Sequence, residues 1–147
     1  MHRGPDIAQV RPRAESEAAA DAWLVADETA ISRAVRVAGR FAAQHDLEAE
    51  AATRLAVVVE EWIANVVEHG GGADSARIVL RLRLSHGLIR ITVSDAGRAF
   101  DPRVVAFHGP NRERGGGAGM ALIASLCRVV DYERRAGRNR LVLELSL

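Results

Sequence analysis

Hydrophobic residues follow two different spacings along this chain, and the spacing predicts where helices and strands lie. In residues 28–45 and 49–68 they recur every three or four positions, which predicts two amphipathic helices. The apolar face of the first helix consists of Ile31, Val35, Ala38, Phe41 and Ala42. That of the second consists of Leu55, Val58, Val59, Trp62, Ile63, Val66 and Val67. A run of three glycines, residues 70–72, follows the second helix and predicts its end.

Elsewhere apolar and polar residues alternate, which predicts strands. Residues 76–84 and 88–93 alternate on either side of Ser85-His86-Gly87 and predict a hairpin with an arginine face and a leucine face. Residues 22–26 form a short strand before Asp27, which stands where a helix N-cap belongs. After a predicted helix over residues 119–130, the chain closes with strands over 131–136 and 140–147, around Gly137-Arg138-Asn139.

Between the hairpin and the last helix, residues 96–117 are too long and too polar for an ordinary connection, which predicts a functional lid. The order of elements predicts an α+β fold, a two-layer sandwich with the helices on one face of a mostly antiparallel mixed sheet. A single domain over residues 22–147 follows a flexible N-terminal arm, residues 1–21.

Composition excludes several functions. The chain of 147 residues has a net charge of +1 and no basic block, so direct nucleic-acid binding is not expected. All 20 basic residues are arginine, which excludes the P-loop lysine and Schiff-base chemistry. Aromatic residues make up only 4%, and alanine is frequent, so we expect helices packed through small side chains. A lone Cys127 and the absence of a long apolar run favour a cytoplasmic protein without a membrane segment.

Three short motifs carry candidate chemistry. Glu61 and Asn65 lie one turn apart on a predicted helix, with Glu68 beside them, and could provide oxygen ligands for Mg²⁺. Asp95 ends a predicted strand, two residues before Gly97, where a carboxylate could accept the amine of a purine. Each of these patterns also has a plain interpretation, as a solvated helix face and as a turn.

The third motif is a glycine-rich segment that runs into a predicted helix, residues 114–123. Backbone N–H groups at the start of a helix bind phosphate without a lysine, and Arg112 and Arg114 could add charge. A flexible loop is the alternative interpretation.

The order and spacing of the three motifs make the chain recognisable. Through EEWIANVVEHG, VSDAGRAFDP and GGGAGMALIASLCRVVDY it resembles the GHKL (Bergerat-fold, histidine kinase-like) ATPase superfamily. Within that superfamily it resembles the anti-sigma regulatory factor, serine/threonine-protein kinase family, from about residue 22 to 147. Ala99 departs from the pattern, because many members have a second glycine there.

The resemblance implies ATP and Mg²⁺ as ligands. It implies that Glu61 is the catalytic base or orients the attacking hydroxyl, and that Asn65 binds Mg²⁺. Asp95 would bind the adenine amine and Gly97 would lie against the ring. The resemblance also implies that the phosphates are bound at the end of the lid, by Arg114, Gly115, Gly117 and Gly119.

The resemblance further implies a bacterial switch that phosphorylates a serine or threonine of a small antagonist protein, sequesters a sigma factor, or does both. An ATP-gated binding module without turnover, or an ATP-binding partner of a two-component system, remains the alternative. A sensor histidine kinase is disfavoured, because the stretch before residue 22 is too short for a dimerisation helix with a phosphoacceptor histidine. A homodimer through residues 28–45 and ordinary core packing both fit the first helix.

Overall fold

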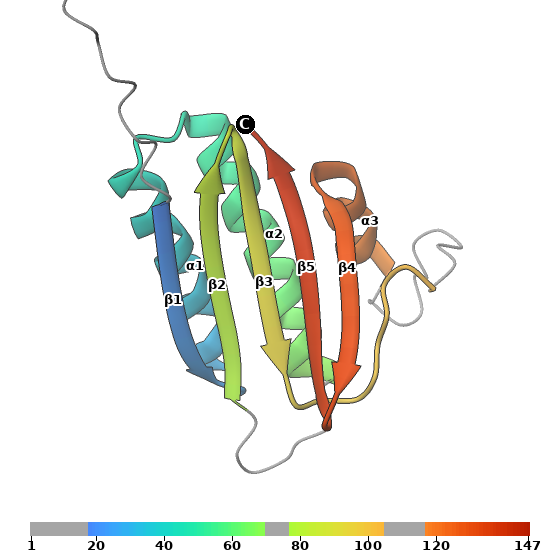
Figure 1. The fold of residues 1–147 in the computed structure, drawn as a ribbon. Coiled ribbons are helices and arrows are strands. Elements are labelled where there is room, and N and C mark those ends of the chain that lie inside the picture. Colours follow the sequence, from blue (N-terminus) through green and yellow to red (C-terminus); the bar gives the residue numbers. More distant parts are fainter. Residues whose placement is uncertain (1–17, 70–76, 105–116) are drawn as a thin grey trace, which may run out of the picture.

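The computed structural model describes residues 18–69, 77–104 and 117–147 (Figure 1). Its elements in chain order are β1 (Ala18–Val25), α1 (Thr29–Gln44), α2 (Ala49–His69), β2 (Arg77–Ser85), β3 (Leu88–Asp95), α3 (Gly117–Leu126), β4 (Arg128–Arg135) and β5 (Arg138–Ser146). The strands form one sheet in the order β1-β2-β3-β5-β4. Within these ranges, no helix is long and apolar enough to cross a membrane.

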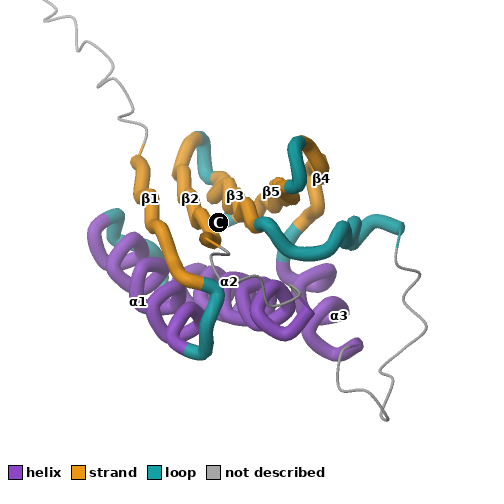
Figure 2. The backbone as a smooth tube through the Cα atoms, turned by 90° about the horizontal axis from the view of Figure 1, so that it is seen from below, coloured by secondary structure: helices purple, strands orange, loops and turns teal. Residues whose placement is uncertain are grey.

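The fold has two layers, because the helices of the described part all lie on one face of the sheet (Figure 2). The alternation in β2 turns Ile78, Leu80 and Leu82 toward the helices, where they are fully buried, and leaves Arg77 and Arg81 exposed on the other face. The predicted α+β sandwich is confirmed. All four strand pairings are antiparallel, so the sheet described is not mixed.

Helix α1 packs on α2 and β1 through its alanines. Ala30, Ala34 and Ala38 are buried with Phe41 and Ala42, whereas Ile31 and Val35 are only partly buried. Ile31 still packs against the core, but the buried positions in the first half of the helix lie one residue before the predicted Ile31 and Val35. Small side chains let α1 approach closely, which confirms the packing expected from the alanine-rich composition. The N-cap of α1 is Glu28, without a side-chain capping hydrogen bond, so the prediction of Asp27 as N-cap was wrong by one residue. Asp27 still contacts the helix start, since its Oδ1 accepts a hydrogen bond from the backbone N–H of Thr29 at 2.8 Å.

Two tight hairpins differ in how well the sequence predicted them. His86 and Gly87 have φ of 49° and 73°, and Ala136 and Gly137 have 50° and 76°; two successive positive values are typical of a type I′ turn. The first turn lies where it was predicted. The second is Ala136-Gly137, so the prediction of Gly137-Arg138-Asn139 was wrong, and β5 already begins at Arg138.

Two element boundaries also differ from the prediction. The last helix runs over Gly117–Leu126 rather than residues 119–130, and Arg128 already pairs with Glu144 as the start of β4. The β-branched Val129 and Val130 suit a strand better than a helix end. At the N-terminus, β1 begins at Ala18, so residues 18–21 of the predicted arm pair with β2. The rest of the arm, the glycine stop at 70–72 and residues 105–116 of the lid lie outside the described residues.

Candidate functional site: a nucleotide pocket between α2, α3 and the end of β3

The second half of α2 carries the first motif. Glu61 and Asn65 are half-buried and lie one turn apart on the face that meets α3. A cavity of about 90 Å³ there is lined by Glu61, Ala64, Asn65, Glu68, His69, Gly119 and Met120. The structure thus brings the predicted carboxylates and amide together with a glycine of the third motif.

Gly119 lies so close to Glu61 that no other residue fits without a shift. A Cβ atom at position 119 would collide with Oε2 of Glu61. Gly117 and Gly119 occupy the first turn of α3, where backbone N–H groups have no partner within the helix. The carboxylate of Glu61 therefore lies beside a helix start that is suited to bind an anion. Arg114 and Gly115 fall outside the described residues.

Asp95 ends β3 and is only 5% exposed. Its Oδ1 accepts hydrogen bonds from the backbone N–H of Gly97 at 2.9 Å and from Nδ2 of Asn139 at 3.0 Å. Both bonds fall on Oδ1, so among the described residues Oδ2 keeps its capacity to accept a further donor. Asp95 and Asn65 line a common cavity of about 20 Å³.

Asn139 holds the loop after β3 in place, a role that the sequence prediction missed. Its Nδ2 also donates to the carbonyl oxygen of Arg98 at 2.7 Å, and its Oδ1 accepts from Tyr132 Oη at 2.7 Å and from Arg134 at 2.8 Å. Arg134 in turn donates to the carbonyl oxygen of Gly97 at 2.9 Å. The side chain is 4% exposed and hydrogen-bonded at both ends, so it is a rigid support for Asp95.

Two aromatic rings fill much of the space next to Asp95. Trp62 and Phe100 have ring centroids 6.0 Å apart, and the backbone N–H of Phe100 donates to Tyr132 Oη at 3.0 Å. Trp62 is 3% exposed, yet its Nε1 has no hydrogen-bond partner within the described residues. A buried donor without a partner is unfavourable, and a ligand acceptor in the adjacent cavity would satisfy it.

The start of the predicted lid is anchored to β4. Arg103 pairs with Asp101 at 2.9 Å and donates to the carbonyl oxygen of Tyr132 at 3.2 Å. The hydrogen bond from Arg103 lowers the pKa of the Asp101 carboxyl. Asp101 therefore stays ionised and paired with Arg103 at neutral pH, and the bond from Arg103 to Tyr132 holds the segment beside the sheet.

The residues present fit a Mg²⁺-bound nucleotide. Mg²⁺ usually takes one or two protein oxygens and fills its other positions with water and phosphate oxygens, which agrees with Asn65 and a neighbouring carboxylate. Within the described ranges, no group of three His, Cys, Asp or Glu side chains is placed to hold a metal ion without other ligands. The two cavities are smaller than the ~300 Å³ or more of an open ligand pocket, so binding requires Phe100 or its loop to move.

Helices on one face of an antiparallel sheet, with a buried aspartate where β3 ends, define an α+β domain of the GHKL, or Bergerat, type. The chain belongs to the histidine kinase-like ATPase domain family, whose pattern matches residues 24–145. It is thus a GHKL-type ATPase domain, and domains of this type bind ATP, typically with Mg²⁺. No curated protein sequence matches the chain.

Several solved structures are similar to the chain, and two of them are histidine kinase structures from one organism. The histidine kinase domain from the Erythrobacter litoralis EL346 blue-light activated histidine kinase has 19% identity and a TM-score of 0.51, over 77% of this chain and 60% of that one. The Erythrobacter litoralis EL346 blue-light activated histidine kinase itself has 24% identity and a TM-score of 0.49, over 67% and 31%. This chain therefore spans less than two thirds of either, and the first likeness shows a shared fold.

Proposed function

We propose that this domain is an anti-sigma factor-type serine/threonine kinase in a cytoplasmic bacterial switch. It would phosphorylate a serine or threonine of a small antagonist protein, sequester a sigma factor, or do both. The observation that carries the proposal is that Glu61, Asn65 and Gly119 line one cavity, next to the cavity that holds Asp95.

Adenine recognition is supported by Asp95 and Trp62, which line one cavity. Asp95 has an Oδ2 that can accept the exocyclic amine of adenine, and Trp62 has a buried Nε1–H without a partner among the described residues. The Watson–Crick edge of adenine offers the complementary pair, an amine donor and a ring-nitrogen acceptor. Guanine presents its donor and acceptor in the reverse order on that edge, so it would have to bind in a different orientation.

The phosphate end is supported by the contact between α2 and α3. Asn65 would hold Mg²⁺, and the N–H groups of the first turn of α3, at Gly117 and Gly119, would bind phosphate oxygens. ATP supplies the phosphoryl group. Glu61 would accept the proton of the incoming hydroxyl, or orient that hydroxyl, because its carboxylate lies on the same face as Asn65.

The proposal is tested by incubating the full chain with labelled ATP and candidate antagonist proteins, followed by mass spectrometry. We expect phosphoserine or phosphothreonine on the antagonist, dependent on Mg²⁺ and formed much more slowly by Glu61→Gln. Label on a histidine of a partner would instead indicate a two-component role. Nucleotide binding without any transfer would indicate a passive ATP-gated module and would contradict the kinase proposal.

A further inference from the structure

A cavity larger than the two of the nucleotide pocket lies at the other end of α2. Its volume is about 450 Å³, and it opens where β5 extends beyond the start of β4, since Leu145 and Ser146 have no partner in the β4 register. It is lined by Arg54, Leu88, Ser125, Leu126, Arg128 and Ser146, among others. Arg54 and Asn65 are 11 helical residues apart, which places this cavity roughly 16 Å from the nucleotide pocket along the axis of α2.

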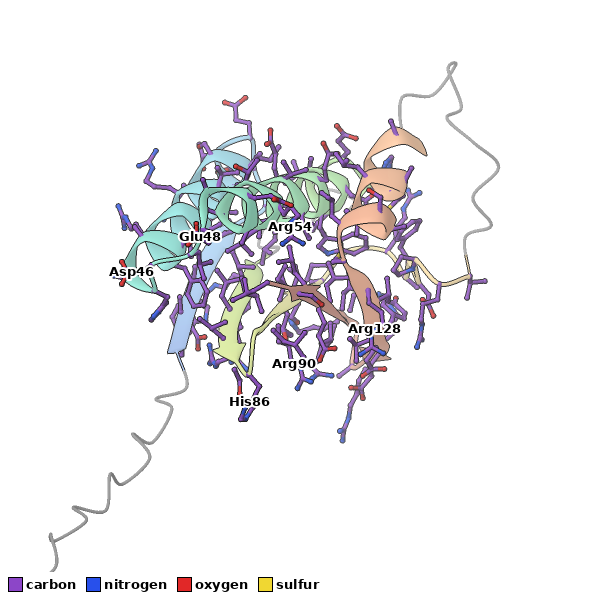
Figure 3. The ribbon with its side chains drawn as sticks, turned by 90° about the horizontal axis from the view of Figure 1, so that it is seen from above. Asp46, Glu48, Arg54, His86, Arg90 and Arg128 are labelled. Atoms are coloured by element: carbon purple, nitrogen blue, oxygen red, sulfur yellow. The ribbon has the colours of Figure 1, made fainter. Side chains whose placement is uncertain are left out.

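Arg54 contributes an unsatisfied charged donor to this cavity. Its side chain lies between α2 and the sheet (Figure 3), and its Nε is buried without a hydrogen-bond partner within the described residues. Glu50, one turn earlier, lies 3.9 Å from that nitrogen, beyond hydrogen-bond distance, and is 88% exposed. A buried guanidinium N–H is costly to leave unpaired, so the group is suited to an acceptor that enters the cavity.

Arg128 adds a second positive charge, held in place from the sheet. Glu144 accepts hydrogen bonds at 2.7 Å from both Arg128 and Arg90, and these bonds lower the pKa of its carboxyl. Glu144 itself lines the cavity with Arg54 and Arg128, whereas Arg90 lies at the same end of the molecule but outside the cavity (Figure 3). Cys127 adds no negative charge at neutral pH, because burial raises the pKa of its thiol to about 11.

The end of α3 acts against an anion, but more weakly. The C-terminus of a helix carries roughly half a negative charge, whereas the two arginines that line the cavity, Arg54 and Arg128, exceed the lining Glu144 by one full charge. Glu50, the ion-pair partner of Arg54, is 88% exposed, so solvent screens its charge. Leu88 and Leu126 supply an apolar wall, and Leu88 is 39% exposed despite its size. The cavity therefore combines a net positive charge with a surface for a hydrocarbon group.

We propose that this cavity is a binding site for an oxyanion group, a carboxylate or a phosphate, on a small ligand with an apolar part. Arg54 and Arg128 would donate hydrogen bonds to the oxyanion, and Leu88 and Leu126 would contact the apolar part. The site is separate from the nucleotide pocket and does not depend on the kinase activity.

The test is a titration of the full chain followed by NMR amide shifts, at constant ionic strength held with chloride. One arm uses inorganic phosphate and the other benzoate, so that the two oxyanions are distinguished. We expect saturable shifts at residues 125–128 and 145–146 with at least one of them. Phosphate bound only in the nucleotide pocket would instead shift residues 117–120 and would overturn the proposal for that anion.

Variants separate the cavity from general charge effects. Arg54→Met should weaken binding by at least about tenfold, since a charged hydrogen bond is lost. Arg36→Gln removes an exposed arginine from α1 and should leave binding unchanged. If Arg54→Met does not fold, Arg128→Gln replaces it with the same expectation. Binding that survives both cavity variants, or no saturable shift with either anion, would overturn the proposal.

Discussion

The two ends of α2 differ in the space that surrounds their buried polar groups. At the end with Asn65, Asn139 is hydrogen-bonded at both of its polar atoms, and Trp62 keeps a buried Nε1–H without a partner among the described residues. The two cavities there measure only about 20 and 90 Å³. At the other end, the cavity is about 450 Å³, and Arg54 keeps a buried N–H without a partner in the described structure. Each end therefore holds one donor that lacks a partner, but the second end leaves far more room for a ligand.

This contrast has a consequence for binding. A nucleotide must displace Phe100 or its loop to enter beside Asp95, so binding there should couple to a change of conformation. The cavity near Arg54 is larger, so an oxyanion can enter it with less rearrangement. Changes at the first end should therefore affect both chemistry and stability, and changes at the second should affect ligand binding and have only small effects on stability.

The largest expected effect is that of Glu61→Gln. Glutamine keeps the size of the side chain but cannot accept the proton, so we expect phosphorylation of the antagonist to slow by about 10²–10⁴-fold. Nucleotide affinity should stay near that of the wild type. The measurement is a single-turnover transfer rate together with ADP binding by calorimetry.

Glu60→Gln is the matched control for that prediction. Glu60 is the preceding residue on α2 but is exposed and does not line the cavity of Glu61. Its variant should transfer phosphate at the wild-type rate. A slow Glu60→Gln, or an active Glu61→Gln, would assign the base to another residue.

The next largest effect is that of Asn139→Ala on stability. The change removes the donor to Asp95 and to the carbonyl oxygen of Arg98, and it removes the acceptor of the bonds from Tyr132 and from Arg134, which keeps its bond to the carbonyl oxygen of Gly97. We expect the free energy of unfolding to fall by about 2–3 kcal/mol and ADP to bind more weakly. Tyr132→Phe breaks fewer bonds and should cost about 1 kcal/mol in urea unfolding. Equal stability of Asn139→Ala and the wild type would refute the supporting role.

Gly119→Ala examines the contact between the two helices of the pocket. The new methyl group would meet Oε2 of Glu61, the end of a flexible side chain, so the carboxylate can move while the helices stay packed. We expect a transfer rate lower by about tenfold, corresponding to roughly 1.4 kcal/mol, and little change in unfolding. Gly39→Ala on α1, where a Cβ meets nothing within 4 Å, is the control and should keep the full rate.

Much of the fold could be predicted, because over a long segment apolar residues every three or four positions indicate a helix and alternating ones indicate a strand. The face of α2 was correct from Leu55 to Val66, since a helix of six turns averages over single misleading residues. The predicted face of α1 was less accurate, because the buried positions are those of the small residues Ala30 and Ala34. A prediction from hydrophobicity prefers the larger Ile31 and Val35 to these alanines. Arg128–Val130 was assigned to a helix because a short apolar run fits either period.

The sequence could predict which candidate residues lie together only where local structure places them. Glu61, Asn65 and Gly119 follow from helix geometry and from a glycine at a helix start, and they line one cavity. Asn139 was placed in a turn, although it continues the inward alternation of Leu141, Leu143 and Leu145, a signal that could have found it. The contact of Trp62 with Phe100 joins residues 38 positions apart, which no periodicity reveals.

At the other end of α2, Arg54→Met should have a small effect on stability. Removing a buried, unpartnered guanidinium N–H and keeping the hydrocarbon chain should leave stability unchanged or raise it by up to about 1 kcal/mol. This is the opposite sign to Asn139→Ala. Urea unfolding of both variants under the same conditions provides the measurement, and a loss above 1 kcal/mol for Arg54→Met would mean that the group already has a partner.

The smallest expected effect is a change in pH dependence at Glu144. Hydrogen bonds from Arg90 and Arg128 hold the pKa of this carboxyl below its ordinary value of 4.5. The stability that Glu144 contributes is therefore present above pH 4.5 and is lost as the pH falls through its folded-state pKa. Both arginines are more than half exposed, so solvent and salt keep the contribution small.

Glu144→Gln lacks this ionisation, whereas the carboxyls of Asp21 and Asp101, whose pKa values are also lowered, titrate in both proteins. We expect the variant to be slightly less stable near neutral pH and the difference to shrink under acid, in urea unfolding across a pH series. A difference that stays constant through the acid range would show that Glu144 is not charged and paired in solution.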